Sequence, residues 1–166
     1  FNGDTRFDLA VTNGTDNNVS ILIANGTGGF NAAANYPAGL GPSGIVVEAF
    51  NGDSKADLAV SDSIANQAAV LINDGFGAFG APNPLSAGGQ PLSLATGDFN
   101  ADTKADLAVA NSASNNISIL IGNGNGPFRG TTFLLSNPQA VSMFDFILDN
   151  KLDLAVVHFY SDEVTI

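Results

Sequence analysis

Aspartates recur in this sequence in four short loops of nearly constant spelling, and carboxylates at such spacing can bind a hard cation. The loops read FNGDTRFDLAV, FNGDSKADLAV, FNADTKADLAV and FILDNKLDLAV, and they begin at Phe1, Phe50, Phe99 and Phe146. Their closing aspartates follow one another at intervals of 49, 49 and 47 residues. A period near 50 indicates stacked supersecondary units instead of one ordinary core.

The third loop carries the most complete set of oxygen ligands. Counted from its first acid, positions 1, 3, 5 and 9 are Asp98, Asn100, Asp102 and Asp106. Lys104 at position 7 offers its backbone carbonyl, and we expect its side chain to point away. Calcium takes about six to eight oxygens, which four side chains, one carbonyl and a water or bidentate carboxylate supply. Magnesium prefers a largely hydrated octahedral site and zinc prefers Cys or His, so the loop predicts calcium.

The other three loops keep most of this set. Their predicted metal-binding residues are Asn2, Asp4, Arg6 and Asp8; Asn51, Asp53, Lys55 and Asp57; and Asp145, Asp149, Lys151 and Asp153. In the first loop, position 1 would lie before Phe1. In the second loop, position 1 is Ala49, with Glu48 one residue away. In the fourth loop, position 3 is Ile147. We therefore expect up to four calcium sites, strongest in the third loop and weakest in the second. The competing interpretation is that these acids only form turns.

The residues between the loops predict short β-strands. In the third unit, strands are expected at about 92–99, 107–111, 117–121 and 128–135, with the Gly-rich turn NGNGPF leading to the last. No segment has sustained helical periodicity. Four-stranded antiparallel sheets repeated at about 40–50 residues are typical of a β-propeller. The sequence thus predicts an all-β array of about three and a half repeats of 47–49 residues, either a partial propeller or an open array.

We expect a single repeat domain over residues 1–166. Its blades are expected at about 1–40, 41–90, 91–137 and 138–166, with the first and last incomplete. The chain does not open with Met and its first residue lies inside an acidic loop, so we interpret it as a fragment or a processed product.

The composition narrows the classes of partner. The net charge is −11, most of the acidic residues lie in the four loops, and no basic patch exists to neutralise phosphates, so nucleic acid is not an expected partner. There is no cysteine, which excludes disulfides and thiolate metal sites. No apolar run approaches the length of a membrane span, so membrane insertion is not expected.

The unit DFNADTKADLAVANSASNNISILIGNGNGPF, residues 98–128, resembles the FG-GAP/VCBS-type repeat of integrin α-subunit-like propellers. The resemblance extends over essentially the whole chain, because the acidic loop, the DLAVAN strand and the GNGxGxF turn occur in the expected order. It implies a calcium-loaded β-propeller on an extracellular or cell-surface protein, with each ion between a blade's first two strands. The family usually has Gly after the second Asp of the loop, where this chain has Thr5, Ser54, Thr103 and Asn150. Gly would be favoured there if φ is positive, and Thr would be strained.

Three further features of the sequence bear on its function. Glycosylation sequons begin at Asn13, Asn18, Asn25 and Asn116. The Gly-rich turns end in Phe30, Phe79 and Phe128, which we expect to fill space between blades. The single histidine, His158, has no evident catalytic partner, and no set of nucleophile and base is readable, so we expect no enzymatic activity.

The expected function is that of an extracellular calcium-binding module for adhesion or for binding a protein or glycan ligand, with calcium in a structural role. Two alternatives remain open. In the first alternative, the chain is a protomer of a larger assembly or filament whose incomplete end blades are completed by neighbouring chains. In the other alternative, it is a non-catalytic part of a polysaccharide-active enzyme.

Overall fold

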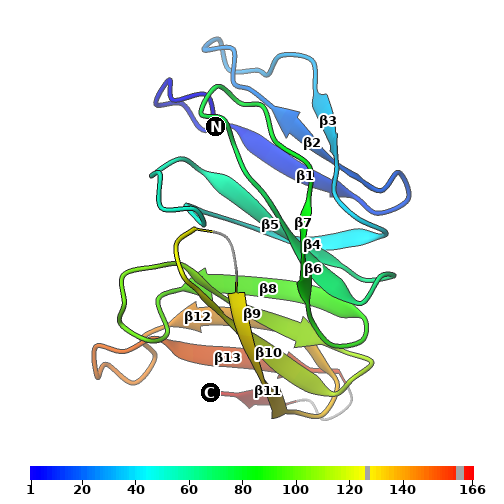
Figure 1. Cartoon of the computed structure of the whole chain (residues 1–166), viewed down its shortest axis with the longest axis vertical. Helices are drawn as coiled ribbons and strands as arrows, with labels where there is room; N and C mark the ends of the chain where they lie inside the picture. Colours follow the sequence, from blue (N-terminus) through cyan, green and yellow to red (C-terminus); the bar gives the residue numbers. More distant parts are fainter. Residues whose placement is uncertain (126–127, 160–162) are drawn as a thin grey trace.

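The computed structural model describes residues 1–125, 128–159 and 163–166, and it contains four antiparallel β-sheets (Figure 1). None of these residues lies in a helix, so the described chain holds no helix that could span a membrane. The predicted all-β class is therefore confirmed. Two residues of the predicted NGNGPF turn, Gly126 and Pro127, lie outside the described residues.

Each sheet takes its strands in sequence order, as a meander. Sheet 1 contains β1 (Leu9–Asn13), β2 (Asn18–Leu22) and β3 (Ala34–Pro37). Sheet 2 contains β4 (Pro42–Glu48), β5 (Asp57–Asp62), β6 (Gln67–Leu71) and β7 (Asn83–Ser86). Sheet 3 contains β8 (Pro91–Gly97), β9 (Asp106–Asn111), β10 (Asn116–Gly122) and β11 (Phe128–Leu134). Sheet 4 contains β12 (Pro138–Phe144), β13 (Asp153–His158) and β14 (Val164–Thr165).

The second strands of the middle sheets are buried on both faces, which explains their nearly continuous apolar sequence. Successive side chains of a strand point to opposite faces. In β5, Leu58 and Val60 accordingly join the core between sheets 1 and 2, whereas Ala59 joins the core between sheets 2 and 3. The same division recurs in β9, where Leu107 and Val109 join the second core and Ala108 joins the third.

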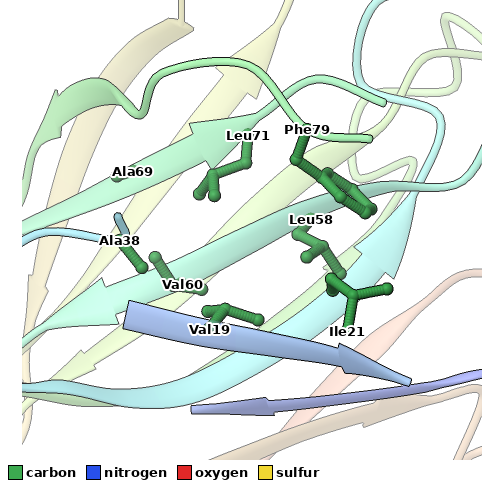
Figure 2. Packing of buried hydrophobic residues seen from close by; sticks show 8 residues of the cluster. All are labelled: Val19, Ile21, Ala38, Leu58, Val60, Ala69, Leu71 and Phe79. Atoms are coloured by element: carbon green, nitrogen blue, oxygen red, sulfur yellow. The ribbon is translucent and has the colours of Figure 1, made fainter. Parts of the chain in front are cut away.

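Three apolar cores fill the spaces between consecutive sheets. Figure 2 shows the first core, where Val19 and Ile21 of β2 face Leu58 of β5. The ring of Phe79 completes it, with the ring of Phe1 at a centroid distance of 5.4 Å. Phe128 likewise packs against the second core, so two of the three turn phenylalanines lie between sheets as predicted.

The sheets pack one after another, in the order 1, 2, 3 and 4, through these three cores, and they do not close into a ring (Figure 1). This agrees with the expected partial propeller or open array. It also makes one prediction wrong. Phe30 does not fill space between blades and is 41% exposed, because no sheet among the described residues packs on its side of sheet 1.

Candidate metal-binding loops

The acidic loops all extend from the same side of the stack, on the left in Figure 1. In sheets 2, 3 and 4 each loop joins the first strand to the second, at 49–56, 98–105 and 145–152, and in sheet 1 the loop precedes β1. The meander therefore places the carboxylates of successive repeats in a row along one edge of the molecule.

The side-chain oxygens of the third loop turn inward and accept hydrogen bonds from the loop's own backbone. Asp98 accepts from the N–H groups of Asp102 at 3.0 Å and Thr103 at 2.7 Å. Asn100 also accepts from the N–H of Asp102, at 3.0 Å, and Asp102 accepts from the N–H of Lys104, at 3.0 Å. The first three predicted ligand side chains thus converge on one small loop.

The closing aspartate fastens this loop to the sheet. Asp106 is fully buried, and its carboxylate accepts from the N–H of Gly122 in β10 and from the N–H of Phe99, both at 2.8 Å. Burial raises the pKa of Asp106, the two hydrogen bonds oppose that effect, and the negative charges of Asp102 and Asp98 add to it. The site thus brings several negative charges together, one of them out of contact with water.

The second loop repeats this arrangement around Asp57. Its carboxylate accepts from the N–H groups of Asn73 at 2.8 Å and Phe50 at 3.1 Å. Burial again raises the pKa of Asp57, and the charge of Asp53 adds to the effect. Glu48, one residue away from position 1, instead lines a cleft of about 360 Å³ between the second and third loops.

The side chain of Lys104 does not point away from the loop, so that prediction is wrong. Lys104 Nζ lies 3.5 Å from Asp102 Oδ2, because the opposite charge two residues earlier lies on the same side of the loop. The equivalent pairs are Arg6 with Asp4 at 2.9 Å, Lys55 with Asp53 at 3.5 Å and Lys151 with Asp149 at 3.3 Å. Each basic side chain therefore offsets the negative charge of the aspartate at position 5. The only metal ligand that the basic residue can offer is its backbone carbonyl oxygen.

The residue after the second Asp has a positive φ in every loop. The angles are 66° at Thr5, 62° at Ser54, 67° at Thr103 and 64° at Asn150. The anticipated conformation is therefore present, with residues other than Gly in it. A second positive φ was missed, at Ala101 and Leu148, both at 62°. The signal was available, because the first two loops have Gly3 and Gly52 at this position, both at 76°.

The comparison with known families agrees with this repeat geometry. A model of the FG-GAP-like repeat matches residues 1–60, 50–109 and 98–156, so each match runs from one acidic loop to the next. The chain belongs to the FG-GAP-like repeat family. No curated protein matches the chain. The resemblance seen in the sequence is thereby confirmed, and it supports a module of the β-propeller type.

The donor set of an FG-GAP-like loop suits a hard cation in its chemistry. The third loop supplies carboxylate and amide oxygens without nitrogen or sulfur ligands, as calcium prefers. Within the described chain, however, no group of three or more Asp, Glu, His or Cys side chains stands at metal-binding spacing. The oxygens instead bond to the N–H groups named above, and each ionised carboxylate has about four lone-pair sites, so one hydrogen bond does not exhaust it.

The sequons lie in different surroundings. Asn25 is the exposed member of the four, and its Oδ1 accepts from the hydroxyl of Thr27 at 2.8 Å. Asn13 is partly buried, and its side-chain amide donates to Asn18 and Ser20, both at 2.7 Å. Asn18 and Asn116 are also partly buried, and Asn116 Oδ1 accepts from the side-chain amide of a neighbouring Asn at 2.8 Å.

His158 is buried at the end of β13. Its Nδ1 lies 2.5 Å from the carbonyl oxygen of Ser136, and its Nε2 lies 2.9 Å from the hydroxyl of Thr165. Both ring nitrogens are thus occupied by the fold. This environment suits a structural role.

Proposed function

We propose that this chain is an extracellular calcium-binding module of the β-propeller type, in which calcium stabilises the acidic loops and the module binds a protein or glycan. The observation that carries the proposal is the burial of Asp106 beside the charges of Asp98 and Asp102. A buried carboxylate is costly unless a cation or several hydrogen bonds compensate it. Lys104 pairs with Asp102, and no ion pair to Asp106 occurs among the residues that the structure describes.

A cation in the third loop would be held by the side chains of Asp98, Asn100, Asp102 and Asp106 and by the carbonyl of Lys104. The equivalent residues would serve in the other three loops. The ion would supply the positive charge that the buried carboxylate lacks. The protein would contribute the fixed turn, because the Asp106 carboxylate already ties Phe99 to Gly122 and so sets the width of the loop.

Thermal melts in chelator, in a calcium titration and in a magnesium control test the metal. We expect a saturable rise of Tm with calcium only, because binding to the folded state stabilises it by mass action. Asp106→Ala should lose the contribution of the third loop. Asp102→Ala, at a partly exposed position, tests the same site with less disturbance of the fold. Asp16→Ala removes one equally negative, exposed side chain outside the loops and should keep the full calcium response.

Equilibrium dialysis then gives the number of ions per chain, which should not exceed four. If Tm and the dialysis count are the same with calcium and with magnesium, or if neither ion binds, the acids act as turn formers and the calcium proposal fails.

The adhesion or ligand-binding role rests on the family. FG-GAP-like repeats are typical of extracellular proteins, and the row of loops on one edge offers a surface that calcium would hold in one conformation. The fixed hydrogen bonds of His158 support a binding role over catalysis. Immobilised glycans and extracellular matrix proteins, probed in calcium and in chelator, test binding. Turnover of any glycan by the purified chain would contradict the non-enzymatic part of the proposal.

A further inference from the structure

A groove lies between the two middle sheets, along their outer strands β7 and β11. Its volume is about 530 Å³, within the range of about 300–1,000 Å³ that is usual for ligand sites. Leu85 of β7 forms one apolar wall, and Leu120 and Phe128 of sheet 3 form the other. Sheets 2 and 3 each contain four strands, so the groove belongs to the interior of the repeat array.

In the interface between sheets 1 and 2, a tyrosine ring occupies the equivalent place. Tyr36 of β3 lies 49 residues before Leu85, which is one repeat. Its ring packs against the first core, with a centroid distance of 5.6 Å to the ring of Phe79. Its hydroxyl donates to the carbonyl oxygen of Gly77 at 3.3 Å. The middle interface has the smaller Leu85 at this position and therefore has no such ring.

The burial of neighbouring residues shows that the two interfaces are filled differently. Ala38, two residues after Tyr36, is fully buried in the first core. Ala87, two residues after Leu85, is only partly buried and lines the groove. Gly130 lies opposite Leu120 in the ladder and adds no side chain to the groove. The space that Tyr36 fills in one interface is therefore open in the next.

A buried hydroxyl gives the groove a polar point. Ser118 lines the groove and is only 2% exposed, and the equivalent residue of sheet 2 is Ala69. The side-chain amide of Asn111 donates to Ser118 Oγ at 2.9 Å, so the serine oxygen is already used as an acceptor. Among the described residues, no acceptor receives the hydroxyl hydrogen of Ser118. That hydrogen is therefore available to an oxygen atom of a ligand.

The lining of the groove restricts the chemistry of the ligand. None of the described residues that line it carries a charge, and the chain has a net charge of −11, which disfavours anions. A sugar would lose the hydration of several hydroxyl groups against the walls made by Leu85, Leu120 and Phe128, and this is costly. A neutral ring that carries one oxygen matches both the apolar walls and the single buried donor.

We propose that this groove binds a neutral phenol ring, with the ring between Leu85 and Leu120 and the phenol oxygen accepting from Ser118. A free small phenol and the tyrosine side chain of a partner protein share this chemistry. The groove contains no residue of an acidic loop, so its ligand does not require bound calcium. Failure of the calcium proposal and failure of this proposal are therefore separate results.

NMR titration of the intact chain with p-cresol, which is the tyrosine side chain without its backbone, tests the proposal. We expect saturable binding with a Kd of about 1 mM, because the ligand is small. The amide shift changes should be confined to the groove, at residues such as Leu85, Leu120 and Thr132. Toluene lacks the oxygen and should bind roughly threefold to tenfold more weakly. Ser118→Ala should remove this difference between the two ligands.

Filling the groove from the protein side should abolish binding. Leu85→Tyr restores the ring that Tyr36 supplies in the first interface, so this variant should melt at or above the wild type and lose its response to p-cresol. Leu40→Tyr is the matched control, since Leu40 is half exposed between β3 and β4 and does not line the groove. Should Leu85→Tyr fail to melt cooperatively, Ala87→Phe fills the same groove from a neighbouring position.

A second ligand distinguishes the two sources of the phenol. N-acetyl-tyrosinamide that binds as tightly as p-cresol supports a tyrosine of a partner protein, whereas binding of p-cresol alone supports a free small phenol. The proposal is overturned if p-cresol shows no saturation up to about 10 mM. It is also overturned if Leu85→Tyr binds p-cresol as the wild type does, or if monosaccharides shift the groove residues and p-cresol does not.

Discussion

Replacing Thr103 by Gly should stabilise the protein. Thr103 has a φ of 67°, a conformation that costs a β-branched residue free energy because its side chain crowds the backbone. The side chain is exposed and contributes no packing. The N–H of Thr103, which donates to Asp98 at 2.7 Å, is retained in Gly. The substitution therefore removes strain without removing a contact.

The size of the effect is a difference between two terms. Relief of the left-handed conformation is worth about 1–2 kcal/mol. The greater freedom of Gly in the unfolded chain offsets about 0.4–1 kcal/mol of this. The net gain is about 0.5–1 kcal/mol, and a chain of this length shifts by about 2–4 °C per kcal/mol. We therefore expect Tm to rise by about 1–4 °C.

Melts and urea titrations in chelator measure this gain without any contribution from bound metal. Asn150→Gly should gain less, because Asn tolerates a positive φ better than Thr does. Thr103→Ala keeps a Cβ and should recover only a small part of the gain. Thr132→Gly, at an exposed position of β11, should destabilise by about 0.5–1 kcal/mol. A Tm for Thr103→Gly at or below that of Thr103→Ala would refute the strain argument.

Two further predictions concern the buried positions of the repeat. Burial raises the pKa of Asp57 and Asp106, so the folded chain holds these protons more tightly than the unfolded chain. In chelator, the free energy of unfolding should therefore rise as the pH falls from neutral through the raised pKa values toward the ordinary 3.8, and thermal melts across this window measure the rise. The loop carboxyls with lowered pKa values have the opposite effect, because their stabilisation is lost as the pH falls below 3.8. Leu58→Ala should cost about 2–5 kcal/mol in urea unfolding and Leu9→Ala less than about 1, since only Leu58 is buried.

The sequence predicted the sheets well because the signals for them are local. Alternation of apolar residues and recurring turn residues placed the third unit's strands near 92–99, 107–111, 117–121 and 128–135, close to the observed β8–β11. The positive φ of Thr103 was anticipated from the resemblance to the family, which usually has Gly at this position of the loop.

The predictions were wrong where the conformation or burial of a side chain depends on a group that only the folded structure brings next to it. Lys104 bends back because of a carboxylate whose position depends on the folded turn. Phe30 and Phe79 have the same sequence context, and they differ only in whether another sheet lies against them. Repetition predicts which face a residue occupies, but burial also requires the partner sheet.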